Sequence, residues 1–145
     1  MAIKLKLEGF DQLLRDIEKA GGNIDRATES AMRQSAVTMQ RELADQMKKA
    51  NVANSLISRM PQFEIEKDYG KVTARVGYKA TGYNPDNPSD YYKAIFINYG
   101  TPYRTKHGHI QARGFIQKAK RRAKPKIKQQ QEEALNKILE RLKRR

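Results

Sequence analysis

The chain has no cysteine and no long apolar run. Without cysteine it has no disulfide bond, no thiol nucleophile and no cysteine-ligated zinc, which fits assembly in a reducing cytoplasm. No stretch reaches the roughly 18 consecutive apolar residues that mark a membrane-spanning helix. The opening MAIKLKLEGF alternates apolar and basic side chains, so we expect neither a signal peptide nor a membrane contact.

Acidic residues are scarce in the carboxy-terminal part of the chain. Residues 104–145 hold 15 Lys and Arg against three acidic residues, a balance of +12, whereas residues 1–103 hold 15 basic and 13 acidic, a balance of +2. Such a cluster attracts nucleic acid through counterion release, or an acidic protein surface through complementary potential. A solvated helix face without a partner is the simpler alternative. The predicted electrostatic surface comprises Lys118, Lys120, Arg121, Arg122, Lys124, Lys126 and Lys128.

A length of 145 residues suits one domain, 1–145, with a core that buries roughly two-thirds of the unfolded surface. Alternating apolar residues predict a strand over 3–7 and a hairpin with strands near 63–66 and 72–76. A helix is expected from Asp11 to about Ala20. A longer helix, Ile24 to Met47, starts at Asn23 or Asp25. Its apolar stripe comprises Met32, Ala36, Met39, Leu43 and Met47.

The second half of the chain predicts two more helices. Residues 79–89 read as a polar loop, followed by a short apolar segment from Tyr91 to Asn98 that Asp90 is placed to cap. Periodicity alone does not separate helix from strand there, and we favour a helix ended by Gly100. The last helix is expected to take Pro125 into its first turn and to run to Leu142.

Residues 118–145 then form a basic helical extension. Three consecutive glutamines, 129–131, break the apolar stripe of that helix, so we expect its amino half to project or to be covered by another subunit. The sequence therefore predicts an α+β fold: a small antiparallel sheet packed against a long helix, with a basic C-terminal helix.

Residues suited to catalysis are few. His107 and His109 have the spacing of metal ligands, but no Asp, Glu or Cys lies between Lys93 and Gln131 to complete a site. We predict no catalytic residue, no metal, no cofactor and no enzymatic activity. The less favoured alternative is a small basic endoribonuclease, in which a proton acceptor activates a 2′-hydroxyl and cations stabilise the phosphorane. Its candidate residues are Tyr103, Arg104, Lys106, His107, His109 and Arg113.

The segment from Tyr91 to Ala119 carries the most specific pattern. An aromatic segment is followed by Gly-Thr, a polar loop, and Ala-Arg-x-Phe opening a basic helical run. The matching residues are Tyr92, Ala94, Tyr99, Gly100, Thr101, Ala112, Arg113, Phe115 and Ala119. In this order they resemble the tail-completion (head-to-tail joining, minor tail component) family of siphophages and prophages. The opening Gly9 to Leu14 is similar to the start of that family. The chain departs from it at Asn98, where an acidic residue is usual, and at Gly114, where proline is usual.

The resemblance implies a virion structural protein that caps the tail tube and joins it to the head connector. It implies tail-tube and head-connector partners, a homo-oligomeric ring, residence in the virion tail and a cytoplasmic stage during assembly. A ring needs heterologous contacts. For these we predict Tyr99, Gly100 and Thr101 on one side of the loop, and Arg113 and Phe115 on the other.

Some alternatives stay open at this stage. Phe115 is either an interface anchor or an ordinary core residue, and Arg113 pairs with backbone carbonyls or a carboxylate. The loop 101–111 is a candidate to order only on assembly. The nearby aromatic residues are favoured as core or interface groups over base-stacking groups. A nucleic-acid-binding module is the main functional alternative, with nonspecific DNA contact through the basic surface.

Overall fold

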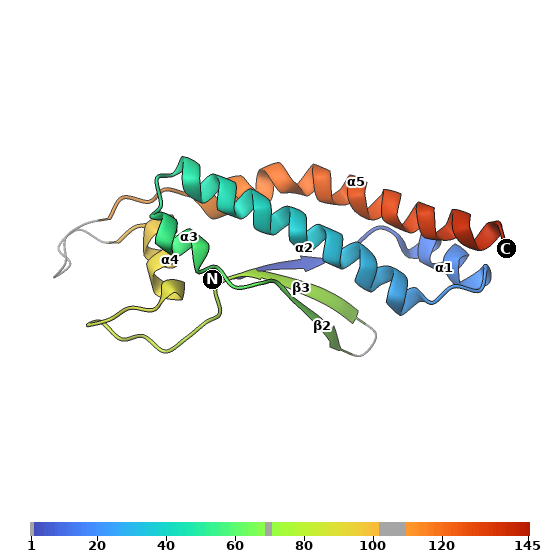
Figure 1. The fold of residues 1–145 in the computed structure, drawn as a ribbon, viewed down its shortest axis with the longest axis horizontal. Helices are drawn as coiled ribbons and strands as arrows, with labels where there is room; N and C mark the ends of the chain where they lie inside the picture. The colour runs from blue at the N-terminus through green and yellow to red at the C-terminus, as the bar shows by residue number, and fades with distance from the viewer. Residues whose placement is uncertain (1, 69–70, 102–109) are drawn as a thin grey trace.

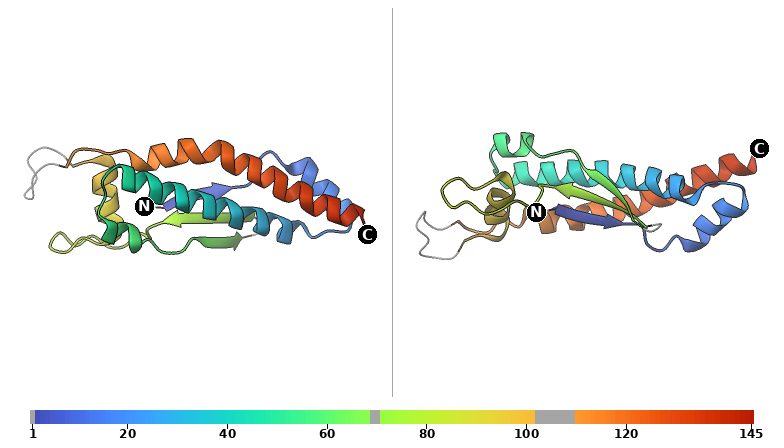
Figure 2. Two further views of the ribbon diagram at one scale, coloured as in Figure 1. Left: turned by 45° about the horizontal axis from the view of Figure 1, so that its top comes forward. Right: turned by 90° about the horizontal axis from the view of Figure 1, so that it is seen from below.

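A computed structural model describes residues 2–68, 71–101 and 110–145. The elements in chain order are β1 (Ala2–Lys6), α1 (Asp11–Lys19), α2 (Ile24–Lys49), α3 (Asn54–Ser58), β2 (Glu64–Asp68), β3 (Lys71–Gly77), α4 (Asp90–Tyr99) and α5 (Phe115–Lys143). The molecule is elongated, with α2 and α5 side by side along its length (Figure 1). The sheet lies against α2, α1 lies at one end, and α3 and α4 lie at the other (Figure 2).

The sheet is antiparallel, and β3 is its central strand, in the order β1-β3-β2. Ile3 stands opposite Val76, and Ile65 stands opposite Ala74, so one face of the sheet is apolar. This face packs on α2, where it joins the larger of two hydrophobic clusters. The α+β fold with a small antiparallel sheet on a long helix is therefore confirmed. The hairpin prediction is also confirmed, because β2 and β3 pair directly.

Helix α2 follows the predicted stripe closely. Asn23 is its N-cap, because the Asn23 side-chain oxygen accepts a hydrogen bond from the Arg26 amide at 3.2 Å. Every residue of the stripe is buried, with exposed fractions between 0% for Met32 and 3% for Met39. A second cluster at the α1 end holds Phe10 and Ile17 against the first turns of α2 and the last turns of α5. Both long helices thus bury apolar side chains along most of their length.

Two expectations for the C-terminal helix are wrong. Pro125 lies inside α5, which begins at Phe115, and not in a first helical turn. Proline removes one backbone donor there, but the helix is held by the buried Ala123 and Ile127 on either side. The amino half of the helix also does not project. It packs against α2 and the sheet, because its buried residues before Pro125, such as Ala119, belong to the same core cluster as residues of those elements.

The three glutamines do not interrupt this packing. Gln129 is exposed, whereas Gln131 is 4% exposed and donates to the Ser35 hydroxyl of α2 at 2.9 Å. Thr38 donates to the Gln130 side chain at 2.6 Å. Burying a side-chain amide lowers the stability of the fold little when its hydrogen bonds are satisfied. Polar residues therefore lie between α2 and α5. The 118–145 segment is thus part of one long helix that packs along α2.

Candidate functional site

Helices α4 and α5 meet at a tight joint, which we call the elbow (residues 97–101 and 110–116). The Arg113 amide donates to the Ile97 carbonyl at 3.0 Å, and the Gly114 amide donates to the Asn98 carbonyl at 3.0 Å. These two bonds use carbonyls of the last turn of α4, which have no partner within that helix. The elbow therefore fixes where α5 begins relative to α4.

Gly100 and Thr101 close the elbow on the α4 side. Gly100 has φ +80°, and a Cβ there would lie 2.9 Å from both the Ala112 nitrogen and the Ile110 oxygen, so no other residue fits without backbone movement. The Thr101 amide donates to the Ile110 carbonyl at 2.9 Å, and the Ile110 amide donates to the Thr101 hydroxyl at 2.7 Å. Thr101 and Ile110, which flank residues 102–109 in the sequence, are thereby held together.

Asn98 caps the start of α5 from the neighbouring helix. Its side-chain oxygen accepts a hydrogen bond from the Ile116 amide at 2.8 Å, and the residue is 1% exposed. The Asn98 amide nitrogen is buried without a hydrogen-bond partner among the described atoms. A carboxylate would offer the same acceptor without a stranded donor and would favour the positive end of the helix.

Arg113 ties the elbow to the end of α2. One guanidinium nitrogen donates to the Ala50 carbonyl at 2.9 Å and to the Asn51 carbonyl at 3.1 Å. These carbonyls lie just beyond α2, where a cation is favoured by the helix dipole. Of the two partners considered from sequence, backbone carbonyls are the ones present, and they belong to the same chain. Arg113 therefore holds three helices together within one subunit.

The other predicted interface residues divide by exposure. Phe115 is 0% exposed and lies in the larger core cluster, so it is an ordinary core residue and presents no surface to a partner. Tyr99, at the end of α4, is 59% exposed. Of the predicted interface set, the side chain best placed to meet another protein is thus that of Tyr99.

Aromatic rings gather on the same end of the molecule. The Tyr83 and Tyr92 ring centroids are 4.9 Å apart, and those of Tyr92 and Phe96 are 6.1 Å apart. Tyr83 comes from the loop before α4 and is 55% exposed. A large exposed aromatic side chain beside half-buried ones is typical of a protein-binding surface.

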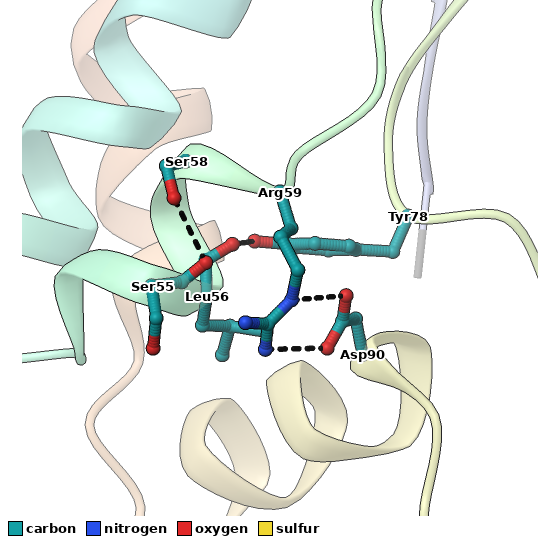
Figure 3. A network of polar contacts seen from close by, with 6 residues as sticks. All are labelled: Ser55, Leu56, Ser58, Arg59, Tyr78 and Asp90. Carbon is teal, nitrogen blue, oxygen red and sulfur yellow. Dashed lines mark hydrogen bonds and ion pairs between the residues drawn. The ribbon is translucent and has the colours of Figure 1, made fainter.

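A polar network fixes α3 against the start of α4 (Figure 3). The sequence predicts Asp90 as the cap of α4, but Asp90 lies in the first turn and accepts two hydrogen bonds from Arg59, at 2.9 Å and 3.0 Å. These bonds lower the pKa of the Asp90 carboxyl below its ordinary value. Tyr78 donates its hydroxyl hydrogen to the Leu56 carbonyl, and burial raises the pKa of Tyr78 to about 12.

The raised pKa of Tyr78 predicts a loss of stability at high pH. The ordinary value is 10.0, so unfolded Tyr78 ionises first and the fold loses this contribution as pH rises from 10 through 12. Between these limits the free energy of unfolding of the wild type should fall by about 2 kcal/mol more than that of Tyr78→Phe. Urea titrations of both proteins at several pH values would measure the difference. Parallel curves would contradict it.

The predicted basic surface lies along the amino half of α5. All seven of its residues are exposed, but they do not share a single face of the helix. Among the described residues, only Lys126 of this set makes an ion pair, with Glu42 at 3.3 Å. The other six make no ion pair with a described residue, so they are open to an external partner or to solvent. The sequence did not indicate that Lys4 and Lys6 of β1 share a groove with three of them.

Of the six candidate residues for catalysis, the structure describes Arg113 alone. His107 and His109, together with Tyr103, Arg104 and Lys106, lie outside the described residues. Within the described ranges, no group of three His, Cys, Asp or Glu side chains is placed to hold a metal ion. No helix in those ranges is long and apolar enough to cross a bilayer.

Comparisons with known proteins returned no match: no family model, no curated protein and no solved structure matches this chain.

Proposed function

We propose that this chain is a tail-completion protein of a siphophage or prophage. In this role it is a structural component that caps the finished tail tube and joins it to the head connector as a ring of copies. It acts as a virion tail protein after a period in the host cytoplasm, and it performs no catalysis and needs no cofactor.

The observation that supports this most is the use made of the motif residues. Gly100, Thr101 and Arg113, which carry the resemblance, are also the residues that build the elbow. Each has a role that a substitution would disturb. Gly100 allows a close backbone approach, Thr101 bonds to Ile110, and Arg113 caps the end of α2. A motif that joins α4, α5 and the end of α2 at one end of an elongated molecule suits a protein whose task is to engage others.

The basic surface supports a second contact. In a ring, α5 would present its cations either to DNA passing through the tail or to an acidic connector surface. The sequence carries no nucleic-acid recognition motif beside these cations. Binding through such a surface is nonspecific and depends on salt.

The salt dependence of DNA binding tests this surface. Replacing Lys120, Arg121, Arg122 and Lys124 by Gln should lower the slope of log K against log salt by roughly 0.9 for each phosphate that the variant no longer neutralises. The fold should be retained, since all four side chains are exposed. Fluorescence anisotropy with two unrelated duplexes would give the slope and show equal affinity for both.

A matched control removes the same charge from the other end of α5. This control variant has the same net charge as the first variant. Its four substituted residues are also exposed: Lys137, Arg141, Lys143 and Arg144, each changed to Gln. If the slope falls equally in both variants, total charge decides the binding and the proposed surface is wrong. Preference for one duplex at physiological salt would instead favour the nucleic-acid-binding alternative.

The joining role itself predicts binding to tails. Purified protein should sediment with isolated tails of the phage that encodes it and not with filled heads alone. Tail binding should be lost for Tyr99→Ala if the exposed end of α4 contributes, while the circular dichroism spectrum stays that of the wild type. RNA cleavage by the pure protein, lost on changing His107 or His109, would overturn the proposal in favour of a nuclease.

A further inference from the structure

The two open edges of the sheet carry opposite charge. Within the described part of the chain, β1 and β2 each pair on one side only, because β3 lies between them. Lys4 and Lys6 project from β1, and Glu64 and Glu66 project from β2. The register places Glu64 and Lys4 on either side of Arg75, and Glu66 and Lys6 on either side of Thr73. Both rows on this face therefore run from an acidic edge to a basic edge.

Helix α5 strengthens the basic edge. A groove between β1 and α5 has an apolar floor that includes Leu5 and Ile127, and its lining contains a single acidic residue, Glu8. None of its lysines makes an ion pair with another described residue. These lysines are Lys4, Lys6, Lys120, Lys124 and Lys128.

The acidic edge is suited to cover this groove. Glu64 and Glu66 are 45% and 44% exposed, and although they contact Lys79 and Arg75, each keeps an oxygen atom that those ion pairs do not use. Phe63 and Ile65 alternate with them toward the helix side and are only half-buried. A strand of this kind, paired with β1, places apolar groups on the side of the groove floor and carboxylates beside Lys4 and Lys6.

Charge also decides between the ways in which two copies can pair by their edges. A two-fold β1–β1 contact would set Lys4 and Lys6 against the same lysines, and a β2–β2 contact would set glutamates against glutamates. Like charges directly opposite each other destabilise a sheet, whereas opposite charges stabilise it. Only the contact between β1 of one copy and β2 of the next matches opposite charges.

We propose that β2 of one copy pairs with β1 of the next and so forms the repeating contact of a head-to-tail assembly. Both strands run antiparallel to β3, so they are parallel to each other and the new contact is parallel. Each added copy leaves one free β1 and one free β2, which is the condition for a ring or an open chain. This contact rests on the proposed function and deepens it by naming the surface that closes its ring.

Engineered disulfides test the contact cleanly, because the chain has no cysteine of its own. Neighbouring strands lie about 4.8 Å apart, within the Cα separation that a disulfide spans. Lys6→Cys and Glu66→Cys are prepared separately, one with a size tag, mixed at high concentration and oxidised with copper phenanthroline. The mixed 6–66 dimer should exceed both homodimers several-fold. In the control, the Glu66→Cys chain is exchanged for a Glu18→Cys chain, whose cysteine lies at an exposed position on α1. No such excess of mixed dimer should then form.

A charge swap then tests the cause. Adding Glu64→Lys to the Glu66→Cys chain should lower the 6–66 yield about two- to fivefold, in line with the usual strength of cross-strand charge pairs. Adding Lys4→Glu to its Lys6→Cys partner should restore the yield. Homodimers in excess, a yield equal to that of the Glu18→Cys control, or no rescue by the swap would overturn the contact.

The outcomes separate the contact from the proposed function. If the cross-link fails but the protein still joins heads to tails, copies meet through another surface and the joining role stands. If the cross-link forms but no joining occurs, the edge contact stands and the joining role is wrong.

Discussion

Phe115→Ala is expected to lower the free energy of unfolding by about 3–5 kcal/mol, the usual cost of removing a buried aromatic side chain. Phe115 is 0% exposed and lies in the core cluster that joins α5 to α2 and the sheet. Urea denaturation followed by circular dichroism would measure the loss.

The matched control for Phe115→Ala is Tyr99→Ala, which removes an aromatic side chain that is 59% exposed. Its stability should stay within about 0.5 kcal/mol of the wild type, as for most surface substitutions. A small loss for Phe115→Ala together with failed tail binding would contradict the core assignment and restore Phe115 as an interface anchor.

Gly100→Ala is expected to cost about 3 kcal/mol or more. One part, about 1–3 kcal/mol, comes from placing a Cβ at φ +80° and ψ 176°, a backbone region that is open essentially only to glycine. The rest comes from contact with backbone, because that Cβ would lie 2.9 Å from the Ile110 oxygen and the Ala112 nitrogen. Opening this contact should also separate the two ends of the elbow. Thermal and urea denaturation would measure the total.

Gly21→Ala measures the cost of a Cβ at positive φ without a close contact. Gly21 has φ +89°, close to the +80° of Gly100, but nothing lies within 4 Å of its added Cβ. Its loss should therefore be limited to about 1–2 kcal/mol. Equal losses for the two variants would mean that the close approach at the elbow contributes nothing.

Local patterns predicted the sheet and α2 because each of these elements buries one face at its own period. The stripe from Met32 to Met47 and the alternation in β3 are read directly from the sequence. The order of strands was not predictable, since no local pattern says which of three strands is central. The opposite charges of β1 and β2 therefore indicate a contact between copies only once the structure shows that both strands are edge strands.

The errors in α5 share a physical cause. Three glutamines in a row predict the end of an apolar face, but Gln131 is buried because Ser35 offers it a hydrogen-bond partner across the helix seam. Pro125 predicts a helix start, but packing on both sides keeps it inside the helix. Both outcomes depend on a neighbouring helix that is distant in sequence, which no local pattern reveals.

The elbow was predictable in part. The order of Gly100, Thr101 and Arg113 in the sequence identifies them as residues of the motif. It does not show that their hydrogen-bond partners belong to the same chain. Asn98 stands out in the sequence only as a departure from the resembled family, and its role as a cap for α5 depends on the two helices meeting. A short polar residue in an apolar helix just before Gly-Thr is the signal that marks it.

The most direct measurement is joining in vitro. Under the proposed function a phage or prophage encodes this chain. Its particles would be prepared with and without the gene and examined by electron microscopy. Without the gene we expect filled heads and finished tails that remain separate, and addition of the pure protein should join them. Joined, infectious particles formed in the complete absence of the chain would contradict a role in head-to-tail joining.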